Sequence, residues 1–164
     1  MSAGYEQVAD WVRRFAADVA ERKTELTKLD QAIGDGDHGT NMDRGLRKAV
    51  EKLDSLEGDD IGAALKAVGM ALVSSVGGAG GPLYGTFFLQ AGQSTAGRTE
   101  LDTAAFAAAV RAGVEGVQNR GKAEPGDKTM IDALLPAADA LDGGGDLAAA
   151  AANAADAAED GMRA

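Results

Sequence analysis

Apolar residues in the N-terminal part of the chain recur at steps of three and four positions, which places them on one face of an α-helix. Between Tyr5 and Arg22 these residues are Val8, Trp11, Val12, Phe15 and Val19. Similar spacing predicts further helices over residues 25–29, 41–53, 61–73, 83–96, 106–117, 130–141 and 146–162. No segment shows the strict alternation of a half-buried strand. The pattern predicts an all-α fold, a helix bundle formed by one domain over residues 1–164.

Glycine-rich stretches separate several of the predicted helices. They cover residues 30–41, 74–82 and 120–129. Glycine allows backbone conformations that break a helix, and Pro82 suits the first turn of the helix that follows it. Pro136, in contrast, lies inside a predicted helix and is expected to kink it. The predicted architecture is therefore a helix bundle with glycine-rich loops.

Composition narrows the class of protein. Hydrophobic residues make up 45% of the 164 residues and aromatic residues only 4%, so the core must consist mainly of Ala, Leu, Val and Met. The net charge of −10 argues against binding to nucleic acid or to an anionic membrane surface. Without cysteine, disulfides, zinc–thiolate sites and cysteine nucleophiles are excluded. No apolar run approaches the ~20 residues of a membrane span, and the N-terminus lacks a signal-peptide pattern, so we expect a soluble, cytoplasmic protein.

The first glycine-rich stretch contains an unusual set of carboxylates. Asp30, Asp35 and Asp37 fall within eight residues, and the only histidine of the chain, His38, follows them. The glycines between them let the backbone bend, so that the three side chains can converge on one point. Carboxylate oxygens without thiols or further imidazoles suit Mg²⁺ or Ca²⁺. A solvated acidic turn is the alternative interpretation, since Asp and Gly are ordinary loop residues.

Three familiar motifs match parts of the chain only superficially. Residues 34–39 have the glycine spacing of a dinucleotide-binding loop, but no predicted strand precedes them. Residues 116–123 approach a P-loop, but Ala123 replaces the Ser or Thr that would hold Mg²⁺. A calcium-binding hand beginning at Asp35 would have Gly39 at a ligand position and Leu46 in place of the bidentate Glu. We reject all three.

The second glycine-rich stretch, Ser-Ser-Val-Gly-Gly-Ala-Gly-Gly-Pro over residues 74–82, offers a different chemistry. Adjacent glycines leave backbone N–H groups accessible to anions. Alone, such a loop is more often a simple helix break. Combined with a hard-cation loop in an all-α chain, it indicates a site for a magnesium-bound polyphosphate.

Three segments resemble a known family. Residues 33–42, 72–88 and 120–130 are similar, in this order, to three signature segments of the nucleotide-binding L subunit of bacterial dihydroxyacetone kinase, of the type that depends on the phosphotransferase system. The resemblance covers most of the chain. It implies a closed barrel of antiparallel helices with the nucleotide at one rim.

The resemblance also implies a set of site residues and partners. Two Mg²⁺ ions would be held by Asp30, Asp35 and Asp37, with no catalytic residue beyond these ligands. ADP or ATP would contact His38, Gly39, Thr40, Asn41, Gly78, Ala79, Gly80, Gly121 and Met130. The phosphoryl group would pass to dihydroxyacetone on a separate substrate-binding subunit, and a donor subunit of the phosphotransferase system would rephosphorylate the resident ADP. The oligomeric state is left open, with a homodimer among the alternatives.

Two features depart from the family pattern. Gly80 stands where the family commonly has Ser, which removes a hydroxyl but keeps the backbone donors. Family members also continue beyond the position of Ala164, into a segment with an arginine and an Asp-Pro-Gly turn, so we expect the chain to be C-terminally truncated. The alternative functions are the nucleotide-binding domain of a fatty-acid-kinase-like protein and a non-catalytic regulatory module that binds metal or nucleotide.

Overall fold

The computed structural model describes all 164 residues and contains eight helices. Their bounds are α1 (Tyr5–Glu21), α2 (Lys23–Gln31), α3 (His38–Asp54), α4 (Ile61–Ser75), α5 (Gly80–Ser94), α6 (Thr103–Gly121), α7 (Ile131–Asp142) and α8 (Leu147–Arg163). Two short strands, β1 (Ala3–Gly4) and β2 (Glu100–Leu101), pair antiparallel near the N-terminus. The all-α prediction is confirmed; strands of two residues are too short to produce an alternating pattern in the sequence.

Aspartates set the starts of three helices. The side chains of Asp60, Asp102 and Asp146 each accept a hydrogen bond from the backbone N–H three residues further on, which caps α4, α6 and α8. The first of these carboxylates also accepts the N–H of Gly97 at 3.1 Å, so it joins α4 to the loop after α5. These local signals explain why the helix starts at 61 and 147 lie within one residue of the predicted ones, and why α6 starts at 103, three residues before the predicted position.

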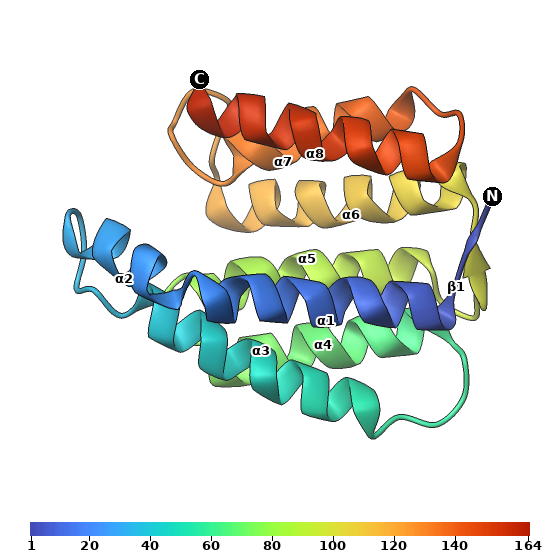
Figure 1. The fold of residues 1–164 in the computed structure, drawn as a ribbon, viewed down its shortest axis with the longest axis horizontal. Coiled ribbons are helices and arrows are strands. Elements are labelled where there is room, and N and C mark those ends of the chain that lie inside the picture. The colour runs from blue at the N-terminus through green and yellow to red at the C-terminus, as the bar shows by residue number, and fades with distance from the viewer.

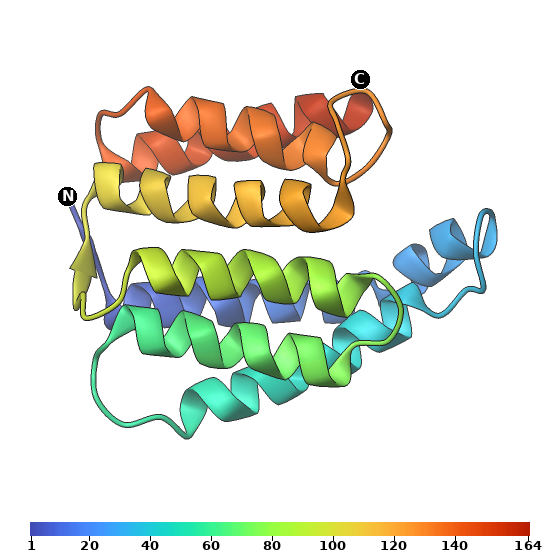
Figure 2. The ribbon, with the colours of Figure 1, turned by 180° about the vertical axis from the view of Figure 1, so that it is seen from behind.

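Helices that follow one another in sequence pack side by side from α3 to α8 (Figures 1 and 2). Helix α1 packs against α3, and its Trp11 and Phe15 rings lie 6.0 and 6.2 Å from the ring of Phe88 on α5. The antiparallel bundle is as predicted.

An apolar cavity of about 520 Å³ lies where α1, α5 and α7 approach one another. Most of the few aromatic side chains of the chain gather around it. Its lining includes Trp11, Phe15, Tyr84, Phe87, Phe88, Met130 and Leu134. None of the eight helices combines the length and the apolar character that a membrane crossing requires.

Glycine allows α4 and α5 to pack with their backbones almost in contact. A Cβ atom added to Gly69 would lie 2.8 Å from the carbonyl oxygen of Gly85, closer than real side chains approach a backbone. The same close approach of the two backbones occurs at a second glycine pair of this interface, Gly62 on α4 and Gly92 on α5. Small residues thus take the place of large apolar ones at this interface, as the low aromatic content suggested.

We expect Gly69→Ala to lower the free energy of unfolding by roughly 1 kcal/mol. Overpacking costs about 1–3 kcal/mol, and the better helix propensity of alanine returns at most about 1 kcal/mol of it. Urea unfolding followed by circular dichroism measures the change. Gly116→Ala on α6 is the matched control, because the nearest atoms to its added Cβ belong to the side chains of Gln90 and Thr86, which can move. Equal stability of the two variants would contradict this account of the α4–α5 interface.

Candidate metal and nucleotide site

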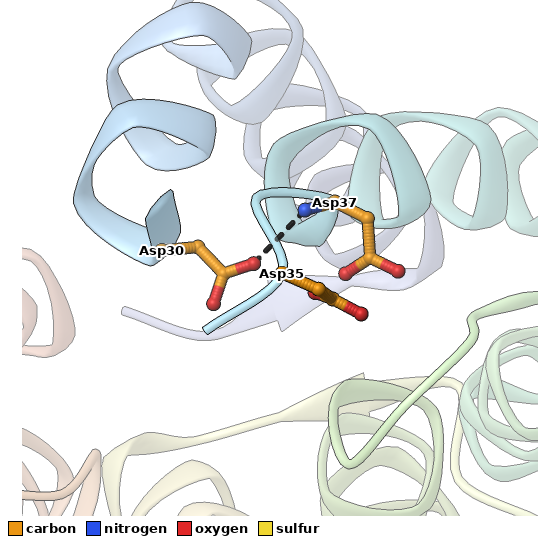
Figure 3. Close-up of side chains that lie close together, drawn as sticks. All are labelled: Asp30, Asp35 and Asp37. Atoms are coloured by element: carbon orange, nitrogen blue, oxygen red, sulfur yellow. Dashed lines mark hydrogen bonds between the residues drawn. The ribbon is translucent and has the colours of Figure 1, made fainter. Parts of the chain in front are cut away.

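Three carboxylates converge at the junction between α2 and α3. Asp30 lies near the C-terminal end of α2, Asp35 in the following loop, and Asp37 at the N-cap of α3. One oxygen of each lies within 4.8 Å of the others (Figure 3). The loop is fixed by its own backbone: the N–H groups of Asp37 and His38 donate to Oδ2 of Asp30 at 2.9 and 3.2 Å. The convergence expected from the sequence is present.

The three acids do not share one electrostatic environment. Partial desolvation opposes ionisation of Asp30, but the N–H groups of His38 and Asp37 outweigh it and hold its pKa below the ordinary value. For Asp35, a hydrogen bond with Asp37 and the negative charge of that neighbour raise the pKa above the ordinary value. Without a cation, Asp35 therefore holds its proton more strongly than an ordinary aspartate does.

The donor set fits a hard divalent cation. Magnesium binds oxygen ligands at about 2.0–2.1 Å, so opposite ligands in its shell lie about 4 Å apart, within the 4.8 Å that bounds the separations of these carboxylate oxygens. Oδ2 of Asp30 already accepts two N–H groups, whereas Oδ1 accepts neither of them. A cation placed among the carboxylates would also remove the repulsion between Asp35 and Asp37.

Helix α3 begins at His38, three residues before the predicted start, so the first predicted nucleotide contacts lie in its first turn. Gly39 is buried against α2, where an added Cβ would lie 2.1 Å from the carbonyl oxygen of Lys23. Thr40 is exposed. Asn41 is nearly buried, and its amide nitrogen lies 3.2 Å from the position of a Cβ added to Gly77. The first turn of α3 therefore faces both α2 and the second glycine-rich loop.

The second loop runs directly past this turn. Gly78 has φ +67°, a conformation that glycine adopts without strain, and Ala79 is the N-cap of α5. A Cβ added to Gly80, the first residue of α5, would lie 3.6 Å from Cε1 of His38. Arg44 of α3 secures the loop by donating to the carbonyl oxygen of Ser75 at 3.4 Å. The N-termini of α3 and α5 thus lie together beside the aspartates.

The third loop is at the same end of the bundle but further from the aspartates (Figure 2). Gly121 ends α6 and lies against Leu83 in the first turn of α5. Met130, the N-cap of α7, lines the apolar cavity described above. The carboxylate of Asp132 organises the loop by accepting the N–H groups of Gly126 and Lys128 at 2.7 and 2.9 Å. The structure therefore groups the first two loops closely, with the third at their margin.

Two polar residues of α3 that support the site, Asp43 and Arg44, were not identified from the sequence. Asp43 is 3% exposed and pairs with Lys23 and Arg47. The guanidinium of Arg47, helped by the Lys23 ammonium, holds the pKa of Asp43 below its ordinary value despite the cost of burial. Arg44 also donates to Oδ1 of Asn41 at 2.9 Å and so orients that amide. The i,i+4 spacing of Asp43 and Arg47 was visible in the sequence, but the contact with Lys23 depends on the fold.

This arrangement can bind a polyphosphate through a cation. The carboxylates attract metal ions, and the free backbone N–H groups at two helix N-termini attract anions. The apolar cavity of about 210 Å³ beside His38, which Met42 and Tyr84 also line, adds a surface for an uncharged group. Fold and site together indicate the class of helical proteins that can bind a polyphosphate through a metal ion.

Comparison with known proteins agrees with this class. Residues 32–164 match the model of the DAK2 domain. The chain is 48% identical over 141 residues to the "PEP-dependent dihydroxyacetone kinase, ADP-binding subunit DhaL" of Escherichia coli. The matched segment covers 86% of this chain and 67% of that protein. It is 41% identical to the "PTS-dependent dihydroxyacetone kinase, ADP-binding subunit DhaL" of Lactococcus lactis, over 75% of this chain and 62% of that protein.

A solved structure agrees as well. The dihydroxyacetone kinase of C. freundii in complex with AMP-PNP and Mg²⁺ superimposes with a TM-score of 0.77 at 28% identity, over 99% of this chain and 30% of that chain. The chain belongs to the DAK2 domain family. It spans about two thirds of the length of the curated subunits it matches.

We expect Asp35→Asn to raise the melting temperature of the metal-free protein while it removes the stabilisation by Mg²⁺. In the folded wild type the pKa of Asp35 is raised, so folding costs free energy once the pH exceeds the ordinary aspartate value, and this cost persists at neutral pH. The amide removes one repelling charge but also one metal ligand. Thermal unfolding at pH 7 with and without Mg²⁺ tests both effects, and a variant that Mg²⁺ stabilises as strongly as the wild type would contradict the site.

Proposed function

We propose that this protein is the nucleotide-binding subunit of a dihydroxyacetone kinase, which uses Mg²⁺-bound ADP and ATP to transfer a phosphoryl group to dihydroxyacetone held by a partner subunit. The observation that carries the proposal is the convergence of Asp30, Asp35 and Asp37 beside the N-termini of α3 and α5. The family and the names of its relatives supply the reaction: the similar proteins of E. coli and L. lactis are ADP-binding subunits of such kinases.

Each group in the site has a role in this proposal. Asp30, Asp35 and Asp37 hold two Mg²⁺ ions, which when bound neutralise charge on the transferring phosphoryl group. Backbone N–H groups at Gly78, Ala79 and Gly80 bind phosphate oxygens, together with the first turn of α3 from His38 to Asn41. Gly121 and Met130 contact the base and ribose side. No covalent nucleophile is required, because such transfer depends mainly on positioning and charge neutralisation.

The partners follow from the same relatives. A subunit named for ADP binding leaves dihydroxyacetone to a second subunit, and the names "PEP-dependent" and "PTS-dependent" support a phosphoryl donor from the phosphotransferase system. In that case ADP stays bound and is rephosphorylated in place. A cytoplasmic location and a homodimer stay predictions.

The direct test is phosphoryl transfer to dihydroxyacetone in a mixture of the purified protein, the substrate-binding subunit and the phosphoryl donor subunit. We expect Asp35→Asn to lower the rate at least about a hundredfold, because it removes a metal ligand from a site where charge neutralisation dominates. Asp60→Asn is the matched control, since asparagine caps a helix as well as aspartate and Asp60 lies at the start of α4. Near-normal turnover by Asp35→Asn would refute the proposed function.

A further inference from the structure

Helix α2 carries Asp30, and its apolar packing is limited: the half-buried Leu26 contacts the core, whereas Leu29 is exposed. None of its nine residues is buried. With the acidic loop it projects from one end of the bundle (Figure 1). A helix this short is only marginally stable in water by itself. Its orientation therefore depends largely on specific contacts with α3.

These contacts run along α2, from Lys23 in its first turn through Thr27 to Asp30 near its end, and the first turn holds both a steric contact and an ion pair. The backbones touch where Gly39 of α3 lies against the carbonyl group of Lys23. One turn further along α3, Oδ2 of Asp43 accepts a hydrogen bond from Nζ of Lys23 at 3.5 Å. The same carboxylate pairs with Arg47 on the other side. A steric contact and an ion pair thus fix the same point of α2.

Burial makes Asp43 the fixed member of this cluster. Its side chain is 4% exposed, whereas those of Lys23 and Arg47 are 43% and 68% exposed. A carboxylate removed from water needs its cationic partners, so leaving it unpaired is costly. Lys23 is the first residue of α2, and its ammonium group is therefore attracted to the carboxylate of Asp43, whose position is fixed by burial.

We propose that Asp43 is a positioning residue for the cation site: together with Lys23 it orients α2 so that Asp30 faces Asp35 and Asp37. Asp30 lies seven residues beyond Lys23, about 10 Å along the helix axis. A rotation of about 10° at Lys23 would therefore move Asp30 by roughly 2 Å, well beyond the ~0.5 Å tolerance of a precise site. This inference rests on the proposed function, since it concerns the same cations.

The variant Asp43→Asn keeps the shape of the side chain and removes its charge. We expect the Mg²⁺ concentration for half-maximal ADP binding, measured by isothermal titration calorimetry, to rise about tenfold, as when an outer-shell partner of a metal ligand is lost. In the metal-free protein, the amides of Asp37 and His38, which donate to Asp30, should exchange hydrogen faster. Lys23→Met should behave like Asp43→Asn, and Lys23→Arg like the wild type.

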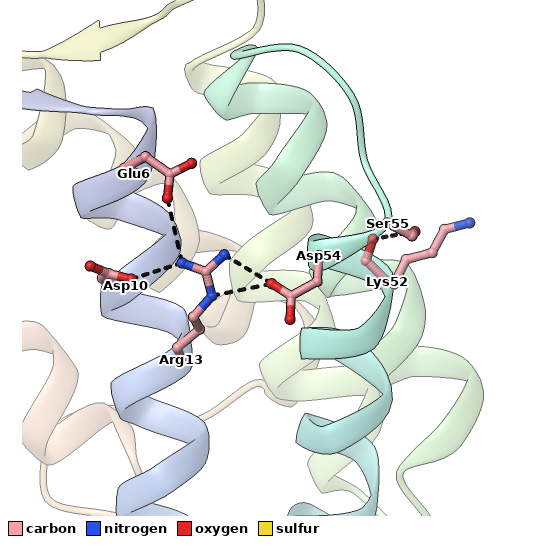
Figure 4. Close-up of polar contacts among 6 residues, drawn as sticks. All are labelled: Glu6, Asp10, Arg13, Lys52, Asp54 and Ser55. Atoms are coloured by element: carbon pink, nitrogen blue, oxygen red, sulfur yellow. Dashed lines mark hydrogen bonds and ion pairs between the residues drawn. The ribbon is translucent and has the colours of Figure 1, made fainter.

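A control is available on the same helix. Near the C-terminal end of α3, Asp54 accepts hydrogen bonds from Arg13 of α1 at 2.9 and 3.2 Å (Figure 4). The guanidinium also lies near Glu6 and Asp10, and all these groups are at least one-third exposed. Asp54→Asn thus removes an ion pair from α3 far from the acidic loop. It should leave both the Mg²⁺ requirement and the exchange of the two amides unchanged.

The outcomes separate the two proposals. A wild-type protein that binds no ADP in the presence of Mg²⁺ would overturn the proposed function, and this inference with it. Magnesium-dependent binding by the wild type, with the same Mg²⁺ requirement and the same amide exchange in Asp43→Asn, would overturn only the positioning role. A lower melting temperature without these two changes would mean that Asp43 serves stability alone.

Discussion

Repulsion among three carboxylates is the constraint on which the arrangement of this end of the bundle depends. One oxygen from each lies within 4.8 Å of the others, and like charges at such distances cost free energy in the absence of a cation. The backbone offsets part of this cost, because the N–H groups of Asp37 and His38 stabilise the charge of Asp30. The repulsion that the backbone does not offset acts on Asp35, and it appears as the raised pKa of that carboxyl group. The loop is thus held in a conformation whose charge is balanced only when a cation binds.

Helix α3 is the element that joins both halves of the site. On one side Gly39 lets it touch α2, and on the other Gly45 admits the side chain of Val76, which lies in the second glycine-rich loop. A Cβ at Gly45 would lie 2.0 Å from Cγ2 of that valine. Arg44, between these two glycines in sequence, binds Ser75 of the same loop. Because one rigid helix contacts both loops, the cation ligands and the anion-binding N–H groups keep a fixed separation.

The sequence predicted most helices and the acidic loop because both depend on local features: apolar spacing, capping aspartates and glycines. The start of α3 was placed three residues late, since His38, Gly39 and Thr40 carry no apolar side chain to extend the pattern. The role of Gly39 against Lys23 and the burial of Asp43 could not be predicted, because both depend on how α2 and α3 cross. The resemblance predicted the loops that meet, but not the contacts that hold them together.

Charge also constrains how an anionic ligand can enter. The protein carries a net charge of −10, but at physiological ionic strength screening over about 8 Å limits the influence of distant carboxylates. The three aspartates are different, because they would face the phosphates directly. A bare polyphosphate would add its charge to theirs, whereas a magnesium complex brings the ions that the aspartates lack. We therefore expect the nucleotide to bind together with its metal, so that one event removes both the repulsion within the loop and the repulsion between loop and ligand.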